Sequence, residues 1–313
     1  MNKPLVSVIC LCHNNEAYVE EAIRSVLNQD YPNVELIAVD DASTDNSEGI
    51  IRQLQEKHGF QAIFNKKNLG NNRSFNLAYR HSKGAFLIDL AADDILLPGR
   101  IKEGVSCLNS KGKNYGVHFC DAELIDEAGK SLGTHYRRDS NGQLLLPVME
   151  GDLYATLLGR YYISAPTMMM KRKVLDDLDG YDENLAYEDF DFWVRSARKF
   201  LYAFTDAVLV QKRILKNSLS SRQRSRNNKH CLSTAMVCQK ALNMNISPEE
   251  TLVLLRRIHY ELKWALITES WDAARLFLEI KHKLKNSTWD GFLNVIIRIR
   301  PSWYWLWKLV LKL

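Results

Sequence analysis

The stretch IAVDDASTDNS, residues 37–47, gives the first indication of the fold class and of where the chemistry lies. It completes an apolar run, Val34–Val39, that has the length and composition of a buried β-strand. Two carboxylates, Asp40 and Asp41, follow the run directly, and the polar residues from Ser43 onward are typical of a helix start. A strand, an acidic turn and a helix in this order predict one unit of an α/β sheet with polar groups at its carboxyl edge.

Similar units surround this stretch. Apolar runs of strand length alternate with segments whose apolar residues have helical spacing. The expected strands are 5–12, 34–39, 60–64 and 85–90, and the expected helices are 16–29, 43–58, 71–81 and the segment that follows Pro98. The alternation predicts an α/β fold with a mostly parallel sheet flanked by helices. Ligands of such sheets bind beyond the carboxyl ends of the strands, so Asp40 and Asp41 should face the same crevice as Asp93 and Asp94, which follow the fourth strand.

The later part of the chain has a different pattern. Further strands are expected at 115–120, 165–170 and 203–210, and the polar segment 121–143 is typical of a hairpin. Beyond about residue 211 the strand pattern ends, and SLSSRQRSRNNKH, residues 218–230, is typical of a basic connector. Helical spacing then returns at 252–265 and 273–284. We therefore expect a first domain at 1–210 and a helical, basic C-terminal region at 211–313.

Charge is unevenly distributed along the chain. At 313 residues, with 46% hydrophobic and 25% charged residues, the composition is typical of a globular protein with a large core. The net charge of +5 conceals a division, because residues 1–198 carry 22 basic against 29 acidic side chains, whereas residues 199–313 carry 20 against 8. An acidic part suited to a cation is thus joined to a basic part suited to an anionic partner.

Cysteines and apolar segments indicate the compartment. The six cysteines include no CxxC pair and lie mostly in apolar runs, which favours reduced thiols over zinc ligands or disulfides. No signal peptide is expected before Leu5, and the apolar segment 292–313 is interrupted by charged residues and Pro301, so no transmembrane helix is expected. We expect a cytoplasmic protein that is either free or peripheral on the inner membrane face.

Three acidic clusters stand out: VDDAS (39–43), AADD (91–94) and YEDFDFW (187–193). Any one of them alone is more often a turn or a helix cap than a site. Together they closely resemble the family 2 glycosyltransferases. The resemblance covers residues from about 4 to about 200 and is carried by SVICLCHNNEAYVEEAIRSVLNQDYPNVELIAVDDASTDNS, NLGNNRSFNLAYRHSKGAFLIDLAADDILLPGR and GYDENLAYEDFDFWVR. It implies a GT-A fold and the transfer of a sugar from a nucleotide-sugar with inversion at the anomeric carbon.

The resemblance implies a nucleotide site at the ends of the first two strands. Asp41 is similar to the family residue that reads the base of the nucleotide, and Asp40 lies beside it. Cys12 and Asn14 are similar to positions that line the same pocket. UDP is the nucleotide that we expect.

A metal site is implied at the AADD motif. Asp93 and Asp94 look like the metal and ribose carboxylates of the family's DxD motif, and Ala91 stands where many relatives have another Asp. A nucleoside diphosphate leaving group gains negative charge as the sugar bond breaks, and a hard divalent cation stabilises that charge. Mn²⁺ or Mg²⁺ suits the task because it binds carboxylate oxygens and keeps positions for phosphate.

The third cluster supplies the expected catalytic base. An inverting transfer needs a carboxylate to deprotonate the acceptor hydroxyl, and Asp189 resembles the family's base. Glu188 is the rival base, and Asp191 is expected to be structural. A structural alternative for Asp189 is the N-cap of a helix at 190–200, and both roles are compatible because a helix dipole keeps such a carboxylate ionised.

Two arginines lie close to the expected site. Arg73 follows the third strand and Arg100 follows the DD motif. Each is either a phosphate contact or a solvated helix charge, and we carry Arg73 forward as a nucleotide-binding residue.

The tail PSWYWLWKLVLKL, residues 301–313, combines three tryptophans with Lys308 and Lys312 on one helix face. Such a helix either lies in a membrane interface or packs on the protein or on a second subunit. It is too short to cross a bilayer. A nucleic-acid role is disfavoured because the aromatic residues are not interleaved with the basic stretch 212–230.

The function expected from these observations is a metal-dependent inverting glycosyltransferase of surface polysaccharide or lipopolysaccharide synthesis. Its partners would be a nucleotide-sugar donor and a glycan or lipid-linked acceptor, with a homo-oligomer left open. The alternative is a non-catalytic family member that acts as a membrane-associated assembly partner. A phospho-accepting receiver domain is excluded by the length of the chain and by the EDFDFWVR motif.

Overall fold

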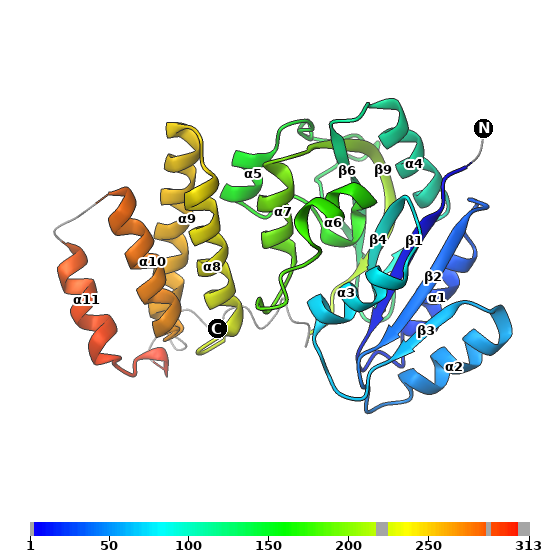
Figure 1. Cartoon of the computed structure of the whole chain (residues 1–313), viewed down its shortest axis with the longest axis horizontal. Helices are drawn as coiled ribbons and strands as arrows, with labels where there is room; N and C mark the ends of the chain where they lie inside the picture. The colour runs from blue at the N-terminus through cyan, green and yellow to red at the C-terminus, as the bar shows by residue number, and fades with distance from the viewer. Residues whose placement is uncertain (1–2, 217–224, 286–288, 306–313) are drawn as a thin grey trace. The chain divides into compact units, whose positions relative to one another are not determined.

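The computed structural model describes residues 3–216, 225–285 and 289–305. The chain divides into two compact units, and Figure 1 traces it from one end to the other. The first unit comprises 1–153, 163–183 and 199–214, and the second comprises 154–162, 184–198 and 215–313.

A large sheet forms the centre of the first unit. Over the described residues it has nine strands, in the order β3-β2-β1-β4-β8-β6-β9-β5, with β7 paired to β6. The strands are β1 (Val6–Cys12), β2 (Val34–Asp40), β3 (Gln61–Phe64), β4 (Phe86–Ala91), β5 (Ile95–Leu96), β6 (Tyr115–Ile125), β7 (Ser131–Thr134), β8 (Met169–Lys171) and β9 (Leu201–Arg213). Strands β1 to β4 are mutually parallel, as are β6 and β9, while β8 runs antiparallel to both β4 and β6.

Helices cover the sheet because its strands are apolar on both faces. Helices α1 (Val19–Leu27), α2 (Ser47–His58) and α4 (Arg100–Ser110) share one core with Val6, Val8 and Cys10 of β1. Helix α3 (Asn71–His81) contacts β1 and β2 and buries Phe75, and α6 (Arg172–Leu178) contacts β6 and β8. Alternate β1 side chains point to opposite faces, so both sides of the strand are buried.

Some predicted elements differ from the observed ones. The expected strand at 165–170 begins instead as a 3₁₀ helix, η1 (Ala165–Thr167), because Pro166 has no N–H for a sheet. Helix α2 begins at Ser47 and not at Ser43, since Ala42 has a left-handed φ of 58° and Asp45 accepts a hydrogen bond from the N–H of Ser47. Strands β6 and β9 extend beyond the expected bounds because they pair with each other along most of their length.

The second unit is helical over its described residues. It contains α5 (Tyr154–Gly159), α7 (Asp189–Ala197), α8 (Lys229–Met244), α9 (Pro248–Ile267), α10 (Trp271–Leu284) and α11 (Trp289–Ile299). Helices α8, α9 and α10 contact one another, and Ser247 is the N-cap of α9, because its Oγ accepts the N–H of Glu250. The two helical patterns predicted after residue 250 are confirmed as α9 and α10. Helix α8 was not predicted.

The aromatic tail is described only as far as Trp305. Trp303 packs within the second unit, because its Nε1–H donates to the carbonyl of Leu266 at 2.8 Å and its ring lies 5.8 Å from that of Trp271. Lys308 and Lys312 lie outside the described residues, as does much of the predicted connector. None of the helices that the structure describes is long and apolar enough to span a membrane.

Candidate functional site

The predicted carboxylate clusters of the first unit follow the two strands that flank β1, at the same edge of the sheet. Strand β1 lies between β2 and β4, and its last residue, Cys12, is paired with Asp40 at the end of β2. The N–H of Asp41 donates to the carbonyl of Cys12 at 2.8 Å, and that of Ala92 donates to the carbonyl of Leu11 at 2.9 Å. The chain segments that carry Asp40–Asp41 and Asp93–Asp94 therefore leave the sheet on either side of the β1 terminus.

Asp40 is completely buried at this edge. Its Oδ2 accepts the N–H of Ser43 at 3.0 Å, whereas its Oδ1 is buried without a hydrogen-bond partner among the described residues. A buried carboxylate oxygen with no donor costs free energy, so Oδ1 is an unsatisfied acceptor at this edge of the sheet.

Asp41 holds a neighbouring loop in place. Its carboxylate accepts three hydrogen bonds of 2.8 Å, from the N–H groups of Leu69 and Gly70 and from Nδ2 of Asn65. The loop thus fixed leads directly into α3, which begins at Asn71. The carboxylate of Asp41, which was predicted to read the base, is thus bonded to the chain's own loop in this structure.

Cys12 and Asn14 lie on the loop after β1. Burial raises the pKa of the Cys12 thiol to about 11, so the thiol is neutral and serves as an apolar surface. Asn14 has a left-handed φ of 56°, and its Oδ1 accepts the N–H of Thr44 at 2.7 Å. Its own N–H donates to Oγ of Ser43 at 2.9 Å. These bonds connect the loops that follow β1 and β2.

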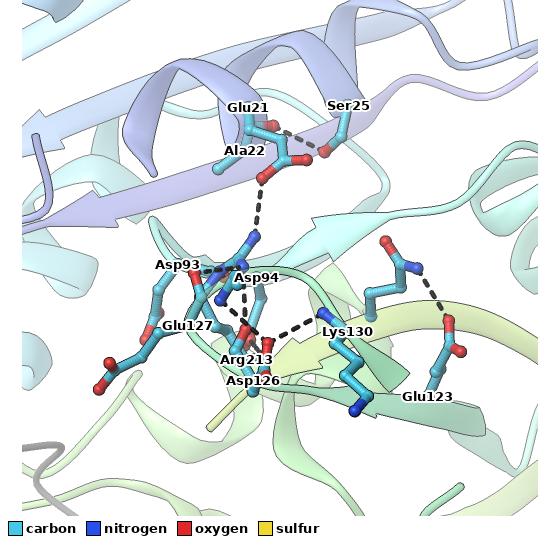
Figure 2. Close-up of polar contacts among 12 residues, drawn as sticks. Glu21, Ala22, Ser25, Asp93, Asp94, Glu123, Asp126, Glu127, Lys130 and Arg213 are labelled. Atoms are coloured by element: carbon cyan, nitrogen blue, oxygen red, sulfur yellow. Dashed lines mark hydrogen bonds and ion pairs between the residues drawn. The ribbon is translucent and has the colours of Figure 1, made fainter. Parts of the chain in front are cut away.

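The AADD motif is held by an arginine that sequence reasoning missed. The N–H of Arg213, the last residue of β9, donates to Oδ1 of Asp94 at 2.9 Å, and its Nε donates to the carbonyl of Asp93 at 3.2 Å (Figure 2). Its Nη2 pairs with Glu21 at 2.7 Å, and its guanidinium lies 4.5 Å from the ring centre of Tyr18. In the sequence, Arg213 is visible merely as a basic residue just beyond the strand that was expected to end at residue 210, which does not indicate this role.

The two carboxyl groups of this motif differ in exposure. Asp94 is buried, and burial together with the charge of Asp93 raises its pKa to about 8. Asp93 is half-buried, and burial also raises its pKa. Ionising both groups is unfavourable unless a cation is nearby, so the pair suits a divalent metal. Among the described residues no group of three or more His, Cys, Asp or Glu side chains is placed to hold a metal ion.

The two arginines have different surroundings. The side chain of Arg73 is half-exposed, with its Nε 3.7 Å from Oε2 of Glu183. Arg100 is fully buried, and its Nη2 donates to the carbonyl of Thr167 at 2.6 Å while its Nη1 lies 3.3 Å from Nδ1 of His118. Both roles expected for Arg100 were therefore wrong, because the buried side chain has no surface that solvent or a ligand could contact.

Glu188 and Asp189 belong to the second unit. Helix α7 begins at Asp189 with Glu188 at the N-cap position, so the predicted cap was displaced by one residue. Both side chains are half-buried. Asp191 is buried and pairs at 2.6 Å with both Arg195 and Lys240, which confirms its predicted structural role.

Comparisons with known proteins give a consistent picture. A family model described as "Glycosyl transferase family 2" matches residues 7–179. An uncharacterized glycosyltransferase of Methanocaldococcus jannaschii is 32% identical over 225 residues, which is 68% of this chain and 72% of that protein. One from Rickettsia typhi is 30% identical over 218 residues, covering 67% of this chain and 64% of the relative. One from Rickettsia felis is 29% identical over 231 residues, 73% of this chain but only 37% of the relative. The chain thus spans between about a third and two thirds of the length of several curated relatives.

Solved structures share the fold. A crystal structure of S. aureus TarS 1–349 in complex with UDP-GlcNAc matches with a TM-score of 0.70 at 16% identity, over 95% of this chain and 88% of that one. The mannosyltransferase PcManGT from Pyrobaculum calidifontis, in complex with GDP-Man and Mn²⁺, matches with a TM-score of 0.58 at 17% identity, over 99% and 84%. These likenesses confirm the predicted GT-A-type α/β fold with a helical C-terminal region.

Proposed function

The chain belongs to glycosyl transferase family 2, and from this premise we propose that it transfers a sugar from a nucleotide-sugar to a hydroxyl group of an acceptor. The observation that supports the proposal is that Asp40–Asp41 and Asp93–Asp94 follow the two strands on either side of the β1 terminus. Parallel sheets bind their ligands at this edge.

The nucleotide occupies the edge formed by the loops after β1 and β2. The orphaned Oδ1 of Asp40 accepts a hydrogen bond from the donor molecule, and Cys12, Asn14 and Asp41 form the wall around the base. UDP is the proposed nucleotide. Arg73, in the first turn of α3, supplies positive charge for the diphosphate once it leaves Glu183.

A Mn²⁺ or Mg²⁺ ion is held by Asp93 and Asp94. Asp93 is the more accessible ligand, and Asp94 is kept in position by the N–H of Arg213. When bound, the cation stabilises the negative charge that develops on the diphosphate. The raised pKa of both carboxyl groups supports this assignment, because a nearby cation favours their ionised forms.

The acceptor hydroxyl is activated by Asp189, with Glu188 as the rival base. The carboxylate takes the hydroxyl proton as the acceptor oxygen bonds to the anomeric carbon. The bond from that carbon to the diphosphate breaks, and its electron pair remains on the phosphate oxygen. Attack from the face opposite the leaving group inverts the anomeric carbon. The position of Asp189 at the N-terminus of α7 supports the role, because the helix dipole keeps the carboxylate ionised.

The acceptor is a glycan or a lipid-linked glycan of surface polysaccharide or lipopolysaccharide synthesis, met at the cytoplasmic face of a membrane. The excess of basic residues after residue 198 supports an anionic surface or substrate as partner. A homo-oligomer is compatible with the same region.

A donor panel tests the proposal. UDP-, GDP-, CDP- and dTDP-sugars are incubated with the protein and Mn²⁺, and release of the nucleoside diphosphate to water is measured. We expect slow release from one donor, its loss with EDTA, and its reduction by about a hundredfold in Asp189→Asn. Asp191→Asn is no matched control, because it breaks two ion pairs of a buried carboxylate. Asp177→Asn, which removes an ion pair with the exposed Lys173, should keep wild-type release. Nucleotide binding without any turnover would favour the non-catalytic alternative.

A further inference from the structure

A cavity of about 680 Å³ lies within the second unit. Its walls come from α5, α8, α9 and the segment before α7, and they include Tyr161, Tyr187, His230, Tyr260 and Trp264. A volume of this size holds one or two sugar rings, and aromatic walls with a few polar groups are typical of small-molecule sites.

A buried cation forms part of the wall. The side chain of Arg257 is only 4% exposed, and its guanidinium lies 4.6 Å from the ring centre of Tyr161 and 4.5 Å from that of Phe190. Its Nε lies 2.8 Å from Oε1 of Glu261 in an ion pair, but Nε and Nη2 are both buried without a well-oriented hydrogen-bond partner among the described residues. A buried guanidinium whose N–H groups lack acceptors costs free energy, and an anion that accepts these hydrogen bonds removes the cost.

Hydroxyl groups line the same wall. The hydroxyl oxygens of Tyr161 and Tyr187 are 3.2 Å apart, and that of Tyr187 lies 2.7 Å from Oγ1 of Thr234. Burial raises the pKa of both tyrosines, so their hydroxyls stay protonated and can donate. The ring of His230 stacks on Tyr187 at 5.1 Å, and its buried Nδ1 has no hydrogen-bond partner within the described part of the chain. These groups suit a ligand rich in hydroxyls.

The charge of the cavity is positive. Arg160 and Arg256 line it together with Arg257, and Glu261 is the acidic residue among its lining side chains. The cavity is also adjacent in sequence to the proposed base, because Tyr187 directly precedes Glu188 and Asp189.

We propose that this cavity binds an anionic sugar unit of the acceptor, with Arg257 pairing with its negative group and Tyr161, Tyr187 and His230 contacting its hydroxyls. The role as an acceptor site rests on the proposed transferase function. The negative group is either a phosphate or a carboxylate, since a guanidinium fork pairs with both.

Calorimetry on the full chain tests the proposal with four probes: glucose 6-phosphate, glucuronate, glucose and inorganic phosphate. At least one anionic sugar should bind about tenfold more tightly than glucose and than phosphate, and the tighter of the two identifies the negative group. Arg257→Gln and Arg256→Gln should each weaken that binding, by about tenfold or more for the buried Arg257. Arg275→Gln, an exposed side chain on α10 outside the cavity, should leave it unchanged.

The outcomes separate this proposal from the transferase function. Binding of glucose as tight as that of the anionic sugars, or no binding of any probe, would overturn it. Unaltered binding of the anionic sugars in Arg256→Gln would overturn it as well. The side chain of Arg256 is exposed, so this variant should fold even if Arg257→Gln does not. Failure to bind any nucleotide while anionic sugars still bind would reject the transferase function and leave the cavity site standing. In Arg257→Gln, UDP affinity should stay at the wild-type value.

Discussion

Arg213, at the end of β9, donates its backbone N–H to Oδ1 of Asp94, which lies 119 positions earlier in the chain. The same residue bonds the carbonyl of Asp93 and pairs with Glu21 of α1. The last strand of the sheet thereby fixes the loop that carries the proposed metal ligands. The residue that organises the AADD motif is thus remote from it in sequence.

Replacing Arg213 should destabilise the first unit. Arg213→Gln removes a buried guanidinium that joins α1 to the AADD loop, and we expect a loss of about 2 kcal/mol in the free energy of unfolding. Urea denaturation measures this loss. Arg24→Gln removes an exposed pair with Glu20 within α1 and should cost less than about 0.5 kcal/mol. If the two variants lost the same free energy of unfolding, the buried contacts of Arg213 would not contribute to stability.

Asp93 and Asp94 should respond differently to neutralisation. Asp93→Asn should weaken Mn²⁺-dependent nucleotide binding by about a hundredfold, because it removes the more accessible ligand charge. Asp94→Asn keeps an oxygen that can accept the N–H of Arg213, so the fold should persist and binding should fall less. Calorimetric titration of nucleotide with and without Mn²⁺ compares the two. A larger loss in Asp94→Asn would reverse the assignment.

Asp41→Asn should release the loop before α3. The asparagine side chain offers one acceptor oxygen where the carboxylate offers two, so hydrogen bonds to Leu69, Gly70 or Asn65 are lost, at a cost of about 1–3 kcal/mol. Amide hydrogen exchange at Leu69 and Gly70 should accelerate by about tenfold more than exchange at Ile9 in β1, which reports only the loss of global stability. If exchange at Leu69 and Gly70 were unchanged in Asp41→Asn, the Asp41 carboxylate would not hold this loop.

The stability of the first unit should fall at acidic pH because of His118. Burial, and then the charge of Arg100, hold the pKa of His118 well below its usual range, so the folded state keeps this ring neutral. Only the unfolded chain takes up the proton below about pH 6.5, and stability therefore decreases there by up to about 1.4 kcal/mol per pH unit from this group. His118→Asn should have a shallower dependence of unfolding free energy on pH between about 5 and 6.5. His58→Asn, at an exposed position, should keep the wild-type slope, and an unaltered slope in His118→Asn would contradict the explanation.

The sequence predicted the half of the sheet formed by β1 to β4 well, for a physical reason. Strands β1, β2 and β4 are largely buried on both faces, so each appears as an apolar run, and the helices between the strands have one apolar side. The carboxylates at their ends were visible because charged residues are conspicuous beside such runs. What these carboxylates contact could not be predicted, since Asp41 binds a loop 28 positions away and Asp94 binds β9.

Other features lacked a local pattern. Helix α8 buries small and polar residues such as Ser233, Thr234 and Cys238, so it has no clear apolar stripe in the sequence. Arg100 follows the acidic motif, yet its burial depends on partners that come from β6 and η1. The cavity around Arg257 combines four separate segments, and no single stretch of sequence indicates it.

The most direct test of the central claim is the anomalous scattering of Mn²⁺ in crystals grown with Mn²⁺ and the nucleoside diphosphate that the protein binds. A Mn²⁺ peak should lie between the diphosphate and the carboxylate of Asp93, at about 2–2.5 Å from an oxygen of each, with the nucleoside against the loops that follow β1 and β2. A peak remote from Asp93 and Asp94, or a nucleotide bound away from the β1 terminus, would contradict the account.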